Sequence, residues 1–298
     1  MAAALAIIGP TASGKSELAL AYARATGDVE LVSVDAMQVY RGMDIGTAKP
    51  TPAELADVPH HMIDIAEPST DSSLVGFLDL ARAAVADIGA RGRRAVLVGG
   101  TGLYVRGLVD ELEVPGQWPE VRDELEAEPD TAALHRRLLA LDPVAAARME
   151  ASNRRRIVRA LEVSIGAERP FSSFGPGLGT YPPRPIVQVG LDVPAEELDR
   201  RIEARVRSML DAGLLEEVRG LAAAPGGLSR TARQALGYRE LLEHLDGTTS
   251  LEDATDRIVA RTRRFARRQR RWFRRDPRIR WLAPRSDVEL LMGFDGFV

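Results

Sequence analysis

The chain has 298 residues, of which 45% are hydrophobic and 28% are charged, and its formal net charge is −3. This length allows a large core in one elaborate domain or in a domain with an insertion. The absence of cysteine excludes a disulfide framework and a thiolate metal site. No apolar run is long enough to span a membrane, and residues 1–8 lack the basic start of a signal peptide, so we expect a cytoplasmic protein without a membrane partner.

The first predicted elements are a buried strand at 5–8 and an Ala/Leu-rich helix at 16–25. The loop between them fits the P-loop pattern GxxxxGK[ST], in which backbone amides, a helix N-terminus and a lysine bind phosphate groups. Lysine occurs only twice in the chain, at Lys15 and Lys49, which favours a functional requirement for it here. A glycine-rich turn without a ligand is the structural alternative. The predicted phosphate-binding residues are Gly9, Pro10, Thr11, Ala12, Ser13, Gly14, Lys15 and Ser16, with the Ser16 hydroxyl as a ligand for Mg²⁺.

Further apolar, β-rich runs alternate with helical stretches such as 74–88, and they lie at 31–34, 62–65, 95–98 and 186–191. This alternation is typical of βαβ units around a parallel sheet. The chain then continues with predicted helices at 195–221, 233–245 and 251–275 and a last strand at 279–282.

Strand signals are missing from the middle of the chain, where acidic and then Arg-bearing helical segments precede a Pro/Gly-rich loop. We therefore predict an α/β fold, with a P-loop NTPase-like parallel sheet flanked by helices and an inserted helical domain. The first part of the core is expected at 1–111, the helical insertion at 112–185, and the return to the core, with Arg-rich C-terminal helices, at 186–298.

Two polar residues follow predicted strands at the sheet edge where the P-loop lies. Asp35 follows the strand at 31–34 and Thr101 follows the strand at 95–98, and folds of this class bind ligands at this edge. Asp35 is a candidate general base or Mg²⁺-supporting carboxylate, and Thr101 is a candidate donor to a substrate; each could instead cap a helix. The glycine-containing segment 36–50 is predicted to be a long ordered loop that holds a ligand.

The last predicted helix carries ten arginines and no acidic residue within 257–275. Ile258, Phe265 and Trp272 recur at heptad spacing, which predicts one packed face and arginines on the others. A solvated charged face usually contains interleaved acids. Their absence favours contact with the phosphate backbone of a nucleic acid.

Taken together, these residues closely resemble the family of bacterial tRNA dimethylallyltransferases, also called tRNA isopentenyltransferases, over nearly the whole chain. The block at 38–50 is the most specific match, since few P-loop proteins contain anything similar. The matching stretches are 9–16, Asp35 with 38–50, 60–64, 99–104, 156–163, 234–240, and Arg268-Gln269 with 272–275.

The resemblance implies transfer of a dimethylallyl group from dimethylallyl diphosphate to the exocyclic amine of the adenosine immediately 3′ of a tRNA anticodon, without ATP. The P-loop would hold the diphosphate, with Lys15 and Mg²⁺ at Ser16 neutralising the leaving group. Asp35 would accept a hydrogen bond or proton from the adenine amine, Thr101 would help to fix the reacting groups, and the adenine would leave the base stack. We expect a monomer.

The resemblance also implies contacts with the tRNA anticodon stem-loop, over which we expect the helical insertion to swing. The implied residues are Asp35, Ala36, Met37, Gln38, Thr101, Arg122, Arg155, Arg156, Ile157, Val158, Arg159, Gln234, Gly237, Tyr238, Arg239, Arg268 and Arg271. Two positions depart from the family pattern. Ala36 replaces a common serine, and Ala195 lies near a common arginine, so one hydroxyl contact and one diphosphate contact are in doubt.

Three other functions remain open. A small-molecule kinase would need ATP, but the strand at 95–98 leads into Gly-Gly-Thr rather than an acidic pair, and a metabolite does not require an Arg-rich helix. A prenyltransferase acting on free adenine nucleotides needs neither the insertion nor so much basic surface. A non-catalytic RNA-binding protein would follow if Ala36 and Ala195 marked lost activity.

Overall fold

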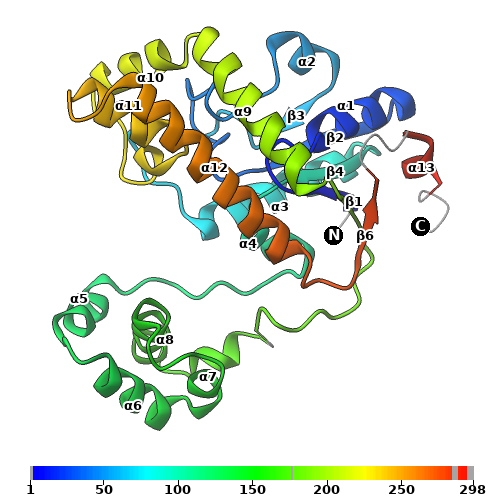
Figure 1. Cartoon of the computed structure of the whole chain (residues 1–298). Helices are drawn as coiled ribbons and strands as arrows, with labels where there is room; N and C mark the ends of the chain where they lie inside the picture. Colours follow the sequence, from blue (N-terminus) through cyan, green and yellow to red (C-terminus); the bar gives the residue numbers. More distant parts are fainter. Residues whose placement is uncertain (1–2, 176, 284–287, 294–298) are drawn as a thin grey trace. The chain divides into compact units, whose positions relative to one another are not determined.

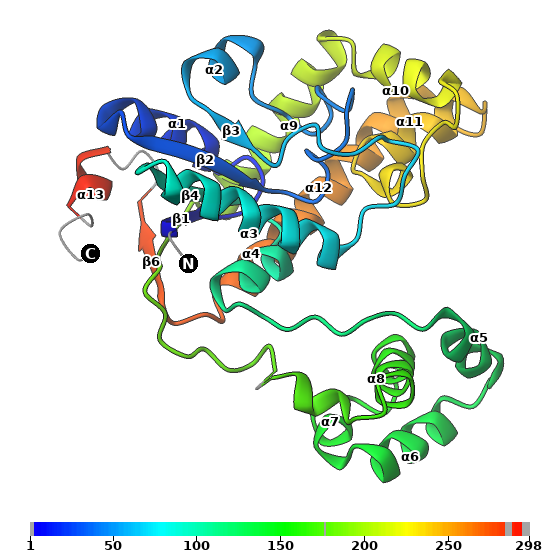
Figure 2. The same ribbon diagram turned by 180° about the vertical axis from the view of Figure 1, so that it is seen from behind.

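The computed structural model describes residues 3–175, 177–283 and 288–293. The chain forms two compact units (Figures 1 and 2): the first combines Met1–Val109 with Pro183–Val298, and the second is Asp110–Pro182. The second unit contains helices and no strand among its described residues; the helical insertion was predicted at 112–185. The predicted α/β class, a parallel sheet flanked by helices, is confirmed. Within the described ranges, no helix is both long and apolar enough to cross a bilayer.

The first unit is built on a six-stranded sheet in the order β3-β2-β4-β1-β5-β6, and every neighbouring pair is parallel. Its strands are β1 (Ala3–Ile8), β2 (Val29–Val34), β3 (His60–His61), β4 (Arg94–Gly99), β5 (Val187–Leu191) and β6 (Ile279–Leu282). Ile8 of β1 and Val34 of β2 both pair with Gly99 of β4. The three strands therefore end level, and the loops that follow them share one edge of the sheet.

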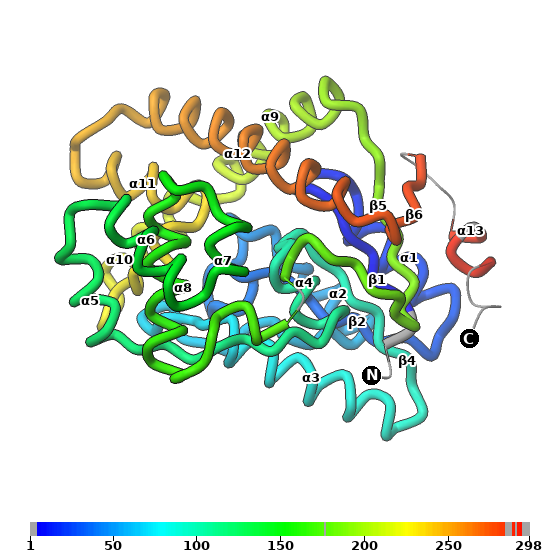
Figure 3. Tube along the Cα trace, turned by 90° about the horizontal axis from the view of Figure 1, so that it is seen from below, coloured from blue at the N-terminus to red at the C-terminus, as the bar shows by residue number. Residues whose placement is uncertain are grey.

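Helices cover both faces of the sheet (Figures 1 and 2). Successive strand residues point to opposite faces, so Ile7 packs with Leu18 of α1 and Leu291 of α13, whereas α3 buries Phe77 and Ala81 on the other side. The helices are α1 (Lys15–Thr26), α2 (Pro52–Asp57), α3 (Leu74–Ala90), α4 (Gly102–Val109), α9 (Ala195–Asp211), α10 (Leu214–Ala223), α11 (Tyr238–Leu245), α12 (Leu251–Phe273) and α13 (Val288–Met292). α12 packs along both α9 and α11 (Figure 3).

The strand predicted at 62–65 is wrong, because β3 ends at His61. Met62 and Asp64 have φ angles of 65° and 55°, which lie in the left-handed region and are incompatible with an extended strand. The apolar pattern of this segment therefore reflects burial of single side chains in a turn, not strand pairing.

The helices predicted at 195–221 and 233–245 have different bounds. Gly213, with φ of 99°, separates the first into α9 and α10. Gly237, with φ of 91°, lies at the start of α11, so the residues before it form only a short 3-10 turn (Ala232–Gln234). Both breaks occur where glycine permits a backbone conformation that other residues rarely adopt.

The second unit consists of α5 (Pro119–Ala127), α6 (Thr131–Leu141), α7 (Pro143–Ala147), α8 (Arg154–Gly166) and a 3-10 turn (Phe171–Phe174). Residues of these helices, whose path Figure 3 shows, form one apolar core. Leu125, Leu138 and Leu161 are almost fully buried there. Asp130 and Asp142 accept hydrogen bonds from the first turns of α6 and α7, which stabilises these short helices. The unit thus has a core of its own.

Candidate active site

A cavity of about 1060 Å³ lies at the edge where β1, β2 and β4 end. Its lining includes residues from the P-loop, from the loops after β2 and β4, and from α9, α11 and α12. The structure thereby brings together predicted site residues that are far apart in sequence. Those that line the cavity are Thr11, Lys15, Ser16, Asp35, Ala36, Met37, Gln38, Thr101, Gln234, Arg239 and Arg268.

The P-loop has the local features of an anion site. Gly14, with φ of 94°, precedes α1, and no side chain caps the first turn of that helix. Ala12 has φ of 62°, a strained conformation for a residue other than glycine. The Ser13 hydroxyl is buried and has no hydrogen-bond partner within the described residues. A phosphate group would satisfy the helix N-terminus.

Lys15 lies in a strongly polarised environment. Its Nζ donates to the Pro10 carbonyl at 3.3 Å. Burial lowers the pKa of Lys15 from 10.5 to about 8; Asp35 opposes this shift, and Arg205 adds to it. The P-loop lysine, the carboxylate after β2 and an arginine of α9 therefore influence one another electrostatically within the cavity.

Arg205 is a candidate site residue that sequence reasoning missed. It lines the cavity, and burial lowers its pKa while Asp35 opposes that shift. No hydrogen-bond or ion-pair partner is found for its guanidinium among the described residues. The signal available in the sequence is helical spacing: Arg205 follows Leu198 by two turns, so it lies on the packed face of α9, where an arginine is unusual.

Asp35 and Thr101 are linked through the backbone between them. Oδ1 of Asp35 accepts from the Met37 amide at 2.8 Å, and Oγ1 of Thr101 accepts from the Ala36 amide at 3.3 Å. Because the Thr101 oxygen accepts this bond, its own proton remains available for a substrate. Asp35 uses only one oxygen in the Asx turn, so the other can accept a proton or hydrogen bond from a group in the cavity.

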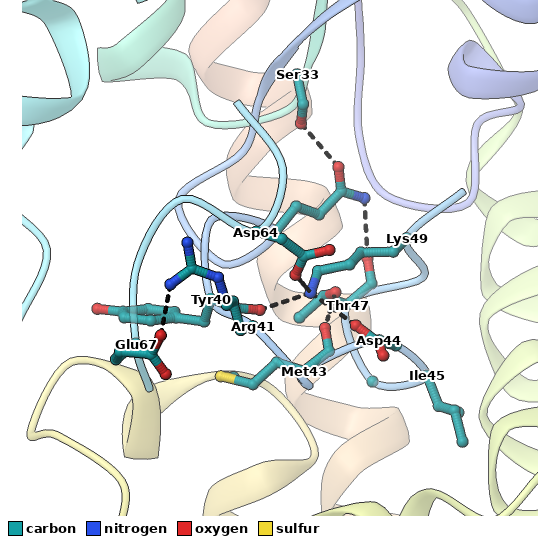
Figure 4. Close-up of polar contacts among 12 residues, drawn as sticks. Ser33, Tyr40, Arg41, Met43, Asp44, Ile45, Thr47, Lys49, Asp64 and Glu67 are labelled. Atoms are coloured by element: carbon teal, nitrogen blue, oxygen red, sulfur yellow. Dashed lines mark hydrogen bonds and ion pairs between the residues drawn. The ribbon is translucent and has the colours of Figure 1, made fainter. Parts of the chain in front are cut away.

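The loop after β2 is ordered by its own polar contacts (Figure 4). Gln38 accepts from the Ser33 hydroxyl at 2.7 Å and donates to the carbonyls of Thr47 and Ala48, each at 3.2 Å. The Glu217 carboxylate of α10 accepts hydrogen bonds from the amides of residues 44–46 and from the Tyr238 hydroxyl. The amide of Gln38, expected to contact tRNA, is thus occupied in shaping the loop.

Lys49 is the buried centre of this loop, with a side chain only 3% exposed. Its Nζ bonds to the Tyr40 carbonyl at 2.5 Å and forms ion pairs with Asp44 at 2.7 Å and Asp64 at 2.5 Å (Figure 4). The second lysine of the chain is therefore structural, and its three bonds use all three ammonium protons.

Replacing Lys49 with methionine is expected to lower the free energy of unfolding by about 2 kcal/mol, because the Tyr40 carbonyl loses its donor and two carboxylates lose their counter-charge. The matched control is Arg41→Met, since Arg41 and Glu67 form a pair whose side chains are 53% and 60% exposed. That change should cost at most about 0.5 kcal/mol. Urea unfolding followed by circular dichroism measures both. Equal losses would contradict the structural role of Lys49.

Comparison with known proteins identifies the family. The sequence model of the family described as IPP transferase matches residues 38–276, and the one described as isopentenyl transferase matches residues 2–67. The chain belongs to the IPP transferase family. The first match covers most of the chain, including the loop after β2 and α12.

Individual relatives agree with this assignment to the IPP transferase family. The tRNA dimethylallyltransferase of Kineococcus radiotolerans is 52% identical over 286 residues, which cover 93% of this chain and 90% of the relative. The structure resembles that of the tRNA isopentenylpyrophosphate transferase of Bacillus halodurans, with a TM-score of 0.72, 37% identity, and coverage of 99% and 96% of the two chains. A eukaryotic dimethylallyltransferase, described as acting on tRNA, has a TM-score of 0.81 at 25% identity, with coverage of 97% and 75%.

In this member of the IPP transferase family, most of the ten arginines at 257–275 pair with acids elsewhere in the chain, although the segment itself contains no acid. Six of them pair with acids of α9 and α11 or with Asp192 after β5; these are Arg257, Arg261, Arg263, Arg267, Arg270 and Arg274. The acids lie on other segments, so the composition of α12 alone did not reveal them.

Three further arginines of α12, namely Arg264, Arg268 and Arg271, and Arg275 in the turn after it, are exposed and have no ion-pair partner in the described part of the chain. Arg264, Arg268 and Arg271 recur at spacings of four and three residues, which places them along one side of the helix, and Arg275 follows its end. We call these four residues the arginine stripe. It contains Arg268 and Arg271, both predicted to bind tRNA.

Other predicted tRNA contacts must be corrected. Ile157 and Val158 are 0% and 5% exposed in the core of the second unit, because helical periodicity turns them inward beside Leu161. Tyr238 is also fully buried, with its ring against Gly46, and burial raises the pKa of its hydroxyl. The side chains of these three residues therefore cannot contact RNA in this structure.

Two predicted arginines of the second unit are arranged around one buried carboxylate. Glu162 is fully buried; it accepts from Arg122 at 2.9 Å and forms an ion pair with Arg159 at 2.9 Å. Arg155 and Arg156, at the start of α8, are exposed and form no ion pair within the described residues. The candidates for phosphate contact in this unit are thus Arg155 and Arg156, with Arg122 and Arg159 partly committed to Glu162.

Proposed function

We propose that this protein transfers a dimethylallyl group from dimethylallyl diphosphate to the exocyclic amine of the adenosine immediately 3′ of the anticodon in tRNA, forming isopentenyladenosine and releasing diphosphate. One observation carries the proposal: a single cavity combines the P-loop with the linked pair Asp35 and Thr101. The names of the relatives in the IPP transferase family support the same reaction. Because one chain supplies all these residues, we propose that the enzyme acts as a monomer.

The P-loop would bind the diphosphate of the donor. Its backbone, the uncapped start of α1 and the charges of Lys15 and Arg205 would neutralise the negative charge that grows as the bond between C1 and oxygen breaks. The family commonly has an arginine near position 195, where this chain has Ala195. Arg205 would supply positive charge in place of that arginine. These interactions strengthen as the leaving group develops, so they lower the barrier rather than only bind the donor.

The residues present fit a Mg²⁺ ion that shares its ligands with the donor. Ser16 offers a hydroxyl oxygen in the cavity, a ligand type that Mg²⁺ accepts. In the described residues, no group of three or more His, Cys, Asp or Glu side chains could hold a metal. Ser16 would therefore hold the ion together with diphosphate oxygens and water. When bound, Mg²⁺ would supply further positive charge to the leaving group.

Asp35 and Thr101 would act on the acceptor. The adenine amine forms a bond to C1 of the dimethylallyl group, the bond from C1 to the diphosphate oxygen breaks, and one amine proton passes to Asp35. Thr101, fixed through the Ala36 amide, would orient the base by a hydrogen bond. The adenine must leave the anticodon-loop stack to reach these groups.

The arginine stripe favours a polynucleotide acceptor over a free nucleotide. Arg268 lines the cavity, but Arg264, Arg271 and Arg275 do not, so the stripe extends beyond the cavity, whereas a mononucleotide would fit inside it. A kinase is not favoured, because the loop after β4 contains Gly100 and Thr101 in place of an acidic pair. The proposed partner is thus the anticodon stem-loop of tRNA.

The test is an acceptor comparison with dimethylallyl diphosphate labelled in its hydrocarbon part. We expect label on unmodified tRNA and a rate at least about 10²-fold lower with AMP or ADP, since neither nucleotide can span the arginine stripe. We also expect no hydrolysis of ATP. Label on the free nucleotides at the rate of tRNA would assign the protein to nucleotide prenylation. ATP-dependent phosphorylation without prenyl transfer would assign it to the kinases.

Replacing Arg205 with methionine is expected to raise the KM for dimethylallyl diphosphate by about 10- to 100-fold, the cost of one charge-assisted contact. The KM for tRNA should change little. Arg207→Met is the matched control, because Arg207 lies on the same helix, is 69% exposed and forms an ion pair with Glu203. Steady-state kinetics with each substrate varied in turn measures both. An unchanged donor KM in Arg205→Met would contradict the diphosphate contact.

A further inference from the structure

Gln269 of α12 connects three distant segments of the first unit. Its side chain is buried, and its amide makes two hydrogen bonds: Oε1 accepts from the Thr11 amide of the P-loop at 2.9 Å, and Nε2 donates to the Gly100 carbonyl after β4 at 2.8 Å. The Thr11 amide therefore donates to the protein rather than to a phosphate. Gln269 lines the cavity, but its amide is used to hold the two loops.

The loop after β4 packs closely against α12. A Cβ atom on Gly100 would lie 2.5 Å from Nε2 of Gln269, and a Cβ atom on Gly102 would overlap the ring of Trp272, one helical turn further along α12. Only glycine allows this close approach at both positions. The backbone on either side of Thr101 is thus pressed against one helix.

The same helix carries the arginine stripe. Arg268 is adjacent to Gln269 in sequence, and Arg271 follows by less than one turn. On the inner side, Gly100 leads directly to Thr101, whose hydroxyl holds the Ala36 amide next to Asp35. A rigid helix therefore links the proposed RNA surface, the proposed acceptor groups and the P-loop, with the Gln269 amide at the junction.

We propose that Gln269 is a positioning residue that fixes the P-loop relative to Thr101, so that an RNA bound along the arginine stripe presents its adenine in line with the donor. This inference rests on the proposed function. Since both polar groups of the Gln269 amide are used in bonds within the protein, its loss should leave each substrate bound but misaligned. Misalignment lowers the rate of the chemical step and not the affinity.

The test compares Gln269→Met, which keeps the side-chain length but removes both hydrogen bonds, with Gln188→Met. Gln188 of β5 is a matched control because it is 2% exposed and its amide has no partner among the described residues. We expect Gln269→Met to lower kcat for prenyl transfer to tRNA by about 10- to 100-fold, with both KM values within about threefold of wild type. Gln188→Met should retain the wild-type kcat.

Hydrogen exchange of the Thr11 amide provides a readout that does not depend on activity. The amide should exchange at least about tenfold faster in Gln269→Met and remain protected in Gln188→Met, because only the first change removes its acceptor. A wild-type kcat in Gln269→Met, a rise in KM without a loss of kcat, or unchanged exchange at Thr11 would overturn the inference. If the wild-type protein transferred no label to tRNA, the proposed function itself would fail. If the wild type were active and Gln269→Met were equally active, only the positioning role would be refuted.

Discussion

Asp35→Asn is expected to lower kcat for prenyl transfer to tRNA by about 10² to 10⁴-fold, the range for loss of a general base. Asparagine retains an oxygen that can accept from the Met37 amide, so the loop should keep its conformation while the proton acceptor is lost. The KM for dimethylallyl diphosphate should remain close to that of the wild type, because the P-loop is intact. Single-turnover assays at saturating donor and tRNA measure the effect.

The control for Asp35→Asn is Asp57→Asn at the end of α2, where Asp57 pairs with Arg24 at the surface. This variant should transfer the label at the wild-type rate. If Asp35→Asn had the same kcat as Asp57→Asn, proton transfer to Asp35 would be contradicted. Asp35 would then serve only to form the Asx turn.

Lys15→Met is expected to lower kcat/KM for dimethylallyl diphosphate by about 10² to 10³-fold, the usual cost of losing one group that stabilises a developing charge. Only the protonated amine neutralises the leaving group, and burial sets the pKa of Lys15 at about 8. In the wild type, kcat/KM for the donor should therefore fall as pH rises above about 8. Lys15→Met should lose this alkaline limb. If kcat/KM of Lys15→Met fell above pH 8 as in the wild type, the titrating group would not be Lys15.

The stability of the protein should depend on pH in the opposite direction through the same lysine. The pKa in the folded state, about 8, is below the ordinary value of 10.5, so the folded protein binds fewer protons than the unfolded chain between these values. The cost of burying the charge is fully present below pH 8 and is relieved as pH rises toward 10.5. Thermal melts over this range should show a larger rise in Tm for the wild type than for Lys15→Met.

Local patterns in the sequence predicted the central part of the fold and site. The alternation of strands and helices gave the parallel sheet, and the P-loop pattern located the start of α1. Asp35 and Thr101 could be placed at the same edge because each lies within two residues of the end of a strand, and the sheet order sets β4 between β1 and β2. These features depend on short stretches of sequence, which is why they could be predicted.

The features that were missed depend on contacts between distant segments. The acids that pair with the arginines of α12 come from α9, α11 and the end of β5, and Gln269 meets the P-loop across the fold. The family resemblance also marked whole stretches without giving the direction of each side chain. Ile157 and Tyr238 were therefore predicted to contact tRNA although packing buries them.

The most direct measurement uses two anticodon stem-loops that differ only at the nucleotide 3′ of the anticodon, adenosine in one and guanosine in the other. Each is incubated with Mg²⁺ and dimethylallyl diphosphate labelled in the hydrocarbon, and both the labelled RNA and the released diphosphate are quantified. We predict one label and one diphosphate per adenosine-containing stem-loop, and no label on the guanosine form. Equal labelling of both RNAs, or release of diphosphate without labelled RNA, would contradict transfer to that adenosine in the cavity of Lys15, Asp35 and Thr101.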